Sequence, residues 1–161
     1  MKHRVQRFSL ALVLCVLAPG LTAQSLQVVR ADGTSTTLTA AQIAALPQVT
    51  ANVGDHDKPA SFEGVPLSAV LSLAGVQLGI RMRGPRLTEV LLVEATDGYK
   101  VVFAVAEVDP DFANREILLA DKRDGKPLDA QEGPFRMIAP GDQRPARWTR
   151  QVTSMQIVAV K

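Results

Sequence analysis

Polar and apolar residues alternate along short stretches of the chain, and this alternation predicts strands joined by tight turns. Residues 25–30 alternate before Ala-Asp-Gly-Thr, a typical turn sequence, and a second short alternating run follows, so we expect a hairpin. Two apolar runs, 87–95 and 99–105, flank Thr-Asp-Gly and predict a second, buried hairpin. The pattern therefore favours a sheet built largely from neighbouring strands.

Further apolar runs complete the predicted sheet. We expect strands at 48–53, 117–121, 135–139 and 152–160. Residues 54–59, Gly-Asp-His-Asp-Lys-Pro, have the composition of a loop. Residues 108–114 contain Asp-Pro-Asp and predict a turn or a single helical turn.

Two short helices are indicated by their end signals. Thr39-Ala-Ala-Gln42 fits a capping box, which predicts a helix to Leu46 that Pro47 stops. The segment beginning at Phe62 should lead into a second helix with Pro66 at its first position. The apolar face of that helix comprises Leu67, Val70, Leu71 and Ala74, and Gly75 fits just past its end. Because strands outnumber helices, the predicted fold class is α+β, with a mixed or mainly antiparallel sheet and a few short helices.

The N-terminal segment differs from the rest of the chain. A basic start, MKHRVQR, is followed by an apolar run and then by Pro-Gly-Leu-Thr-Ala, the pattern of a cleaved secretory signal. We predict a signal peptide at residues 1–23, cleavage after Ala23 and one domain at 24–161, located in the periplasm or secreted. An uncleaved anchor is the alternative, but the run is about half the length that a spanning helix needs.

Charge and cysteine content narrow the function classes. The whole chain has a formal net charge of +2, but Lys2, Arg4 and Arg7 lie in the predicted leader, which leaves 15 basic and 16 acidic residues in 24–161. Such a domain has no bulk attraction to nucleic acid or anionic membranes, so any basic patch must be local. The single cysteine, Cys15, is also in the leader. The predicted domain therefore lacks a disulfide, a thiol nucleophile and a thiolate metal ligand.

One loop rich in Gly, Pro and Arg carries the strongest chemical signal. Residues 132–148 read EGPFRMIAPGDQRPARW, and the cationic side chains in and after this segment are Arg136, Arg144, Arg147 and Arg150. Guanidinium groups bind phosphate through paired donors, and a loop rich in glycine and proline leaves backbone N–H groups free, so the segment predicts an anion site. In the alternative interpretation Arg136 points outward from a strand, the other arginines solvate a loop, and Trp148 fills the core.

A family resemblance emerges from the order of these pieces. FEGVPLSAVLSLAG, ATDGYKVVF, ILLADKRDGKPL and GPFRMIAPGDQRPARW follow one another and close on a hydrophobic strand, over residues 62–160. This succession resembles the molybdopterin-binding domain of the sulfite oxidase family. The resemblance implies that family's fold and a molybdopterin cofactor. It also implies that Arg136, Arg144 and Arg147 bind the cofactor's phosphate, and that Asp97, Tyr99 and Trp148 lie near it. For Asp97-Gly98-Tyr99, a purely structural role in a hairpin turn is the alternative.

The chain departs from the family at the metal. Catalytic members hold molybdenum through a cysteine thiolate near the end of the strand before the Gly-Val-Pro-Leu helix, and residues 49–56 contain no cysteine here. Asp55, His56 and Asp57 are hard or borderline ligands that do not reproduce a soft thiolate. Adjacent loop residues can hardly all face one ion, so we predict a solvated loop and no metal site.

Three functional hypotheses remain open. The first is an exported protein that binds molybdopterin or another small anionic ligand without autonomous catalysis. The second is a molybdopterin-dependent oxidoreductase, or a subunit of one, with a redox or sensor partner. The third is a non-catalytic interaction module that uses a sheet edge or the basic segment 81–86.

Overall fold

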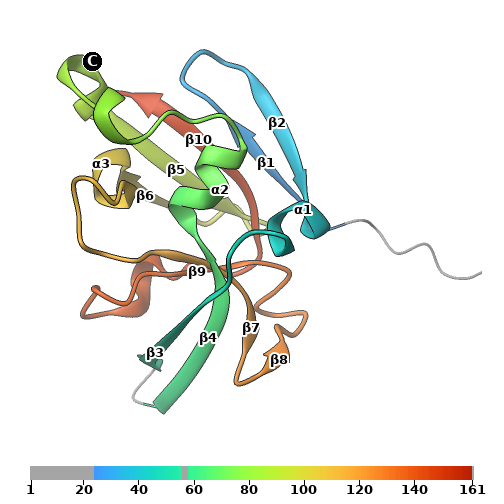
Figure 1. The fold of residues 1–161 in the computed structure, drawn as a ribbon. Helices are drawn as coiled ribbons and strands as arrows, with labels where there is room; N and C mark the ends of the chain where they lie inside the picture. Colours follow the sequence, from blue (N-terminus) through green and yellow to red (C-terminus); the bar gives the residue numbers. More distant parts are fainter. Residues whose placement is uncertain (1–23, 56–57, 161) are drawn as a thin grey trace, which may run out of the picture.

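Two sheets carry the fold in the computed structural model, which describes residues 24–55 and 58–160 (Figure 1). The first sheet has the strand order β2-β1-β10-β5-β6, with β1 and β10 parallel and the other neighbours antiparallel. Its strands are β1 (Ser25–Val29), β2 (Ser35–Thr39), β5 (Glu89–Ala95), β6 (Lys100–Ala104) and β10 (Val152–Ala159). This sheet contains both predicted hairpins, β1–β2 and β5–β6.

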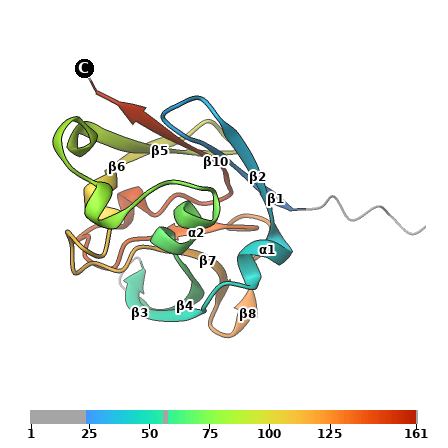
Figure 2. The same cartoon turned by 45° about the horizontal axis from the view of Figure 1, so that its top comes forward.

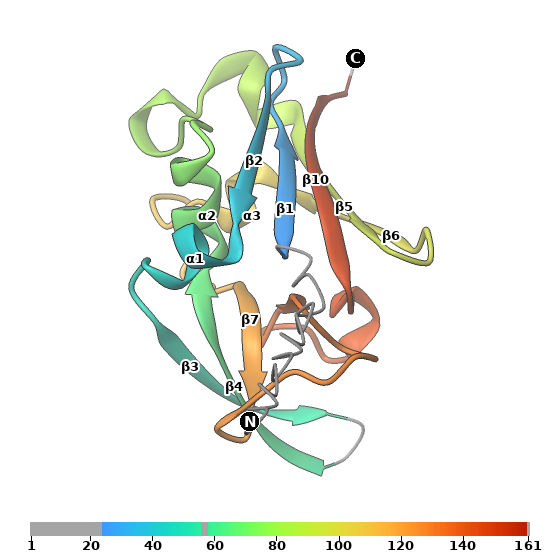
Figure 3. The same ribbon diagram turned by 90° about the vertical axis from the view of Figure 1, so that its right-hand side faces the viewer.

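The second sheet is antiparallel and has the order β3-β4-β7-β8, with β9 also paired to β7. Its strands are β3 (Val49–Asp55), β4 (Lys58–Pro66), β7 (Leu118–Arg123), β8 (Lys126–Pro127) and β9 (Arg136–Ile138). Figure 3 shows that β3 and β4 extend away from the first sheet. The second sheet therefore brings residues 49–66 together with residues 118–138, which lie far away along the chain.

Short helices connect the strands. They are α1 (Ala40–Ala44), α2 (Leu67–Leu73) and α3 (Val105–Val108), together with the 3₁₀ turns η1 (Gly79–Arg81), η2 (Gly84–Thr88) and η3 (Pro145–Arg147). Figures 2 and 3 show α1 and α2 on one side of the first sheet. Both ends of the predicted capping box are present, because the Thr39 hydroxyl accepts from the Gln42 N–H and the Gln42 side chain accepts from the Thr39 N–H. None of the helices described is long and apolar enough to cross a membrane.

A single apolar cluster lies beneath the helices and between the two sheets. Alternate residues of β1, β5 and β6 are buried in it, as the period of two predicts, whereas consecutive residues of β7 and β9 are buried. The predicted apolar face of α2 also packs there, and all four of its residues are buried. Gly75 follows α2 with a φ of 83°, the left-handed conformation expected just past a helix end. These observations confirm the α+β class.

The sequence-based prediction was wrong about β4. Residues 54–59 were expected to form a loop and residues 62–65 to lead into a helix, but β3 continues to Asp55 and β4 begins at Lys58. Pro66 ends this strand and caps α2 rather than occupying its first turn. Proline and glycine weaken the strand pattern locally, whereas pairing with β3 on one side and β7 on the other stabilises it.

Gly64 shows why this strand contains a glycine. A Cβ atom added there would collide with the carbonyl group of Leu119 and with Cα of Ala120, both backbone atoms of β7. The register of the β4–β7 pair also shifts between Glu63 and Gly64. Glycine therefore permits the close approach of two strands, one of the ordinary reasons for glycine inside a sheet.

Candidate functional site

Arg136 is a charged residue that is almost completely buried, with 1% of its surface exposed. It lies on β9, and all three residues of that strand are buried. β9 pairs with β7 so that Arg136 lies opposite Ala120. A buried guanidinium needs charged or hydrogen-bonding partners to offset its desolvation.

Two carboxylates supply those partners. Nη1 and Nη2 of Arg136 donate to the two carboxylate oxygens of Asp55, each over 3.1 Å, and Nη1 also donates to Glu132 Oε1 over 2.6 Å. Asp55 is the last residue of β3, and Glu132 precedes the Gly-Pro that leads into β9. The fork-to-fork pairing with Asp55 is the geometry that arginine uses for carboxylates and phosphates alike.

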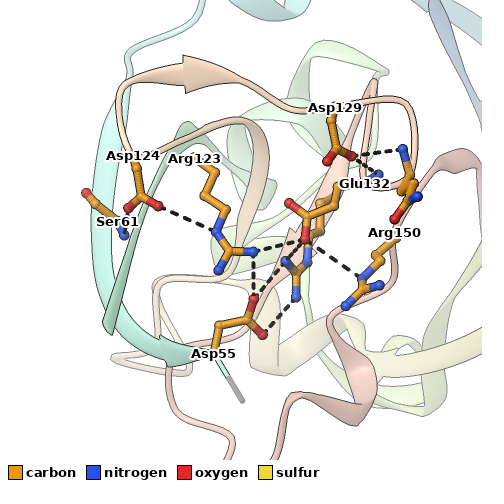
Figure 4. A network of polar contacts seen from close by, with 9 residues as sticks. Asp55, Ser61, Arg123, Asp124, Asp129, Glu132 and Arg150 are labelled. Carbon is orange, nitrogen blue, oxygen red and sulfur yellow. Dashed lines mark hydrogen bonds and ion pairs between the residues drawn. The ribbon is translucent and has the colours of Figure 1, made fainter. Parts of the chain in front are cut away.

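Two further arginines extend the network toward solvent. Nη1 of Arg123 lies 3.1 Å from both Asp55 Oδ2 and Glu132 Oε1, and the Arg150 Nε lies 4.0 Å from Glu132 Oε1. The Arg123 and Arg150 side chains are 31% and 47% exposed. Figure 4 shows these groups on either side of Glu132. The ion network, defined here as Asp55, Arg123, Glu132, Arg136 and Arg150, thus contains three guanidinium groups and two carboxylates.

Aromatic rings enclose the buried part of the ion network. The Arg136 guanidinium lies over the Phe62 ring at 4.8 Å and near the Trp148 ring at 5.9 Å, and the two rings meet edge to face at 6.2 Å. Trp148 is buried and its indole N–H donates to the Ala139 carbonyl over 3.0 Å. The Arg136 Nε is buried without a hydrogen-bond partner in the part of the chain described. Cation–π contact with the rings partly offsets this unsatisfied donor.

Arg147 forms a separate ion-pair cluster. Its Nε and Nη2 donate to both oxygens of Asp142 over 2.9 and 2.6 Å, and its Nη1 donates to Glu107 over 2.7 Å. Its guanidinium also lies 4.4 Å over the Phe103 ring. Hydrogen bonding by Asp142, and then by Glu107, raises the pKa of Arg147 above its ordinary value and favours its charged form. This arginine connects the segment 139–147 to α3 and β6.

The Asp97-Gly98-Tyr99 turn lies beside η3. Gly98 has a φ of 82°, and Asp97 Oδ1 accepts the Tyr99 N–H over 2.9 Å, so the turn closes as its sequence predicts. The half-exposed Tyr99 donates its hydroxyl hydrogen to the Ala146 carbonyl over 2.8 Å. Arg144, just before η3, is exposed.

The predicted site residues thus fall into two groups. Arg136 and Trp148 meet in the interior. Tyr99 and Arg147 lie around η3, where the Tyr99 hydroxyl donates to a carbonyl and the Arg147 guanidinium to carboxylates of the chain itself. The expectation that Arg136 could point outward was wrong, because it is buried, whereas Trp148 does fill the core. A role of these residues toward a cofactor stays a prediction.

Sequence reasoning missed how the ion network is assembled. Asp55 was considered only as part of a solvated loop, and neither Arg123 nor Glu132 stood out. The signal existed in the Gly-Pro-x-Arg segment, but its partner is 81 residues away along the chain. His56 and Asp57 lie outside the described residues.

The chemistry of the donors decides whether molybdenum fits this region. The implied cofactor needs a soft sulfur ligand for the metal and free cationic donors for the phosphate. The segment where the thiolate is expected instead ends in Asp55, whose carboxylate is bonded to Arg136 and Arg123. No group of histidine, cysteine or acidic side chains in the described part of the chain could hold a metal ion. The residues that the structure describes therefore do not fit a protein-ligated molybdenum centre.

One small hollow, of about 10 Å³, lies beside Arg147 and its partners Glu107 and Asp142. A wider one, about 670 Å³ and open to solvent, is lined by Asn52, Val53, Gly54, Lys58, Pro59, Ala60, Ser61 and Asp124. Its wall is mainly apolar, and Asp124 there accepts the Ser61 N–H over 2.9 Å. This hollow on the β3–β4 hairpin contains one lysine and none of the predicted arginines.

Comparisons with known proteins agree with the sequence resemblance. Residues 56–160 match the family model described as "Oxidoreductase molybdopterin binding domain". Among solved structures, the fold is similar to that of the sulfane dehydrogenase SoxCD from Paracoccus pantotrophus, with a TM-score of 0.65 and 17% identity. The match covers 84% of this chain but only 38% of that one. No curated protein matches the chain. Because the family model spans most of the chain, this protein belongs to the family of oxidoreductase molybdopterin-binding domains.

Proposed function

We propose that this protein is an exported, non-catalytic member of the molybdopterin-binding family that binds a small anionic ligand, either molybdopterin or a smaller anion. The observation that carries this proposal is the ion network. Its buried arginine, Arg136, is the arginine of the family-like Gly-Pro-x-Arg segment, and it is neutralised by Asp55 from the segment where a thiolate is expected. The buried charge of Arg136 is thus compensated by a carboxylate of the chain itself.

The charge balance of the ion network favours an anion at its exposed margin. Three guanidinium groups share two buried carboxylates, and Arg150 is held only loosely, at 4.0 Å from Glu132. Asp124 adds a weak ion pair to Arg123 at 3.6 Å, but its side chain is 61% exposed and screened by water. A phosphate or carboxylate that contacts Arg123 and Arg150 from the solvent side, away from Glu132, would complete the balance. Both side chains are open enough to reach it.

The non-catalytic part rests on ligand chemistry. Oxygen-atom transfer in this family relies on a thiolate that tunes the metal, and residues 24–161 contain no cysteine. The oxidoreductase alternative would need a metal held by the pterin and by non-protein ligands alone. We therefore place the enzyme hypothesis second.

The first experiment measures what the exported protein carries. The full chain is expressed with its N-terminal segment, recovered from the periplasmic fraction, and its N-terminus is sequenced to test cleavage after Ala23. Molybdenum is quantified by mass spectrometry and pterin by the fluorescence of its oxidation product. We expect less than stoichiometric molybdenum. Stoichiometric metal together with substrate turnover would refute the non-catalytic proposal.

A second experiment locates the anion. Inorganic phosphate, as the simplest probe, should raise the thermal midpoint of the wild-type protein by mass action. Arg150→Gln should reduce that increase, because it removes one of the two exposed cations of the proposed anion site. Arg150 faces solvent and has little structural role, so the variant should still fold. Arg115→Gln, also an exposed arginine, is the matched control and should leave the increase intact. Equal responses from the two variants would exclude the margin of the ion network as the anion site.

A further inference from the structure

The segment 78–88, called here the docking loop, displays apolar and cationic side chains together at the surface. Ile80 is 85% exposed, and Leu87 is 47% exposed. Arg81 and Arg83 are also exposed, and neither forms an ion pair with any residue in the described part of the chain. Figures 1 and 2 show this green segment projecting at the periphery of the ribbon, away from β3 and β4.

The docking loop is firmly anchored beneath its exposed tip. Met82, between the two exposed arginines, is 1% exposed, and its N–H donates to the Gly79 carbonyl over 2.8 Å. Arg86 makes a bidentate pair with the buried Glu89 over 3.1 and 2.9 Å and also donates to the Arg81 carbonyl over 3.3 Å. The exposure of Ile80 is therefore imposed by an ordered turn and does not result from fraying.

A second loop contributes another apolar side chain. The Gly79 N–H donates to the buried carboxylate of Asp109, and the Asp111 carboxylate lies against Gly79. The half-exposed Phe112 follows directly. Two neighbouring loops, each pinned through its backbone, thus carry exposed apolar groups at one edge of the molecule.

We propose that the docking loop contacts an anionic lipid surface, with Ile80 entering the interface and Arg81 and Arg83 meeting lipid phosphates. A protruding apolar tip with satisfied backbone donors can enter the boundary of a bilayer without exposing unpaired N–H groups. A flat anionic surface needs no matching cavity, whereas an acidic protein partner would need a pocket shaped for Ile80. The attraction is local, because residues 24–161 are close to neutral overall, and, among the described residues, Arg81 and Arg83 outnumber the one exposed carboxylate, Asp111, that lies against the loop at Gly79.

This inference goes beyond the proposed ligand function and fails independently of it. The test uses the exported full-chain product in a co-sedimentation assay with phosphatidylcholine vesicles, with and without phosphatidylglycerol. We expect binding only to the anionic vesicles, and binding should weaken as salt rises. Ile80→Ser should abolish most of it, and neutralising Arg81 or Arg83 with Gln should weaken it by about fivefold for each charge.

Matched controls separate the docking loop from general surface effects. Val102→Ser removes an exposed apolar residue of β6, and Lys126→Gln removes an exposed cation of β8; both should bind as the wild type does. All variants share the same N-terminus, so a retained leader would not create differences between them. Thermal midpoints equal to that of the wild type would show that the variants are folded.

Two results would overturn the proposal. The first is equal binding of wild type and Ile80→Ser, or of anionic and neutral vesicles. The second is binding to a poly-glutamate peptide without binding to any vesicle, which would assign the loop to an acidic protein partner. Loss of phosphate binding in the Arg150→Gln variant leaves the vesicle result unaffected, so the two proposals can be told apart.

Discussion

Asp55 determines what the buried arginine of this protein can do. Its two oxygens occupy both terminal nitrogens of Arg136, and Arg123 shares one of them. A phosphate group would compete for the same donors. Because both charges are almost fully removed from water, loss of Asp55 would leave Arg136 with Glu132 as its remaining counter-charge among the described residues and with two donors unpaired.

We expect Asp55→Asn to destabilise the protein by about 3 kcal/mol, because it removes the charge of the bidentate partner of a buried guanidinium and leaves Glu132 alone to balance it. The free energy of unfolding is measured by urea titration followed by circular dichroism. Glu94→Gln is the matched control, since Glu94 pairs with Lys100 at 3.4 Å at the surface, with 37% and 52% of the two side chains exposed. That change should cost less than about 1 kcal/mol. Similar losses in the two variants would contradict the role assigned to Asp55.

The arginines of the segment 132–148 could be recognised from the sequence, but the full set of carboxylates that bind them could not. Arg136, Arg147 and Trp148 stood out because of their spacing around glycine and proline. Glu132 and Asp142, which bind Arg136 and Arg147, belong to the same segment, whereas Asp55 comes from β3 and Glu107 from α3. No local pattern predicts the two distant partners. The candidate site was therefore identified by its cations, and its electrostatics were decided by contacts across the fold.

At the scale of elements, the hairpin β3–β4 and strand β7 hold the ion network in place. The close approach of β4 to β7 at Gly64 brings β3, which carries Asp55, within reach of Arg123 and Arg136. Local signals were sufficient for the elements whose ends carry distinct chemistry, such as the capping box of α1 and Gly75 after α2. They were insufficient for β4, since its pairing on both sides outweighs its glycine and prolines.

Gly64→Ala should destabilise the fold by roughly 3 kcal/mol, the upper part of the range for overpacking, because the added methyl group meets backbone atoms that cannot rotate away. Gly54→Ala is the matched control on the same hairpin, where an added Cβ meets nothing within 4 Å and φ is not positive. Urea unfolding of both variants measures the difference. A small effect of Gly64→Ala would mean that β4 and β7 separate easily.

At the scale of the whole molecule, the two sheets share one apolar core. Trp148 contacts Phe62 of the second sheet, while the neighbouring Arg147 lies over Phe103 of the first, so the segment around η3 joins both. The ion network is satisfied by the chain's own carboxylates. The fold should therefore form cooperatively without any cofactor.

We expect protein produced in a host unable to make molybdopterin to unfold in a single transition, with a midpoint matching that of protein from a normal host after its ligand is removed. Fluorescence of Trp148, the only tryptophan, and far-ultraviolet circular dichroism should give the same urea midpoint. Two separate transitions would show that the protein does not unfold as one cooperative unit. An unfolded product in the deficient host would show that the fold needs the cofactor.

The sequence by itself determined the α+β class, both hairpins of the first sheet, the capping box of α1, the apolar face of α2 with Gly75 after it, the family and the absence of cysteine after residue 23. Each of these depends on composition or on residues close together in the chain. Only the tertiary structure decided that Asp55 meets Arg136, that β4 is a strand, and that Ile80 stands exposed above a buried Met82. These features depend on strand pairing and packing between distant segments, and the free energy of such contacts is not encoded in any local pattern.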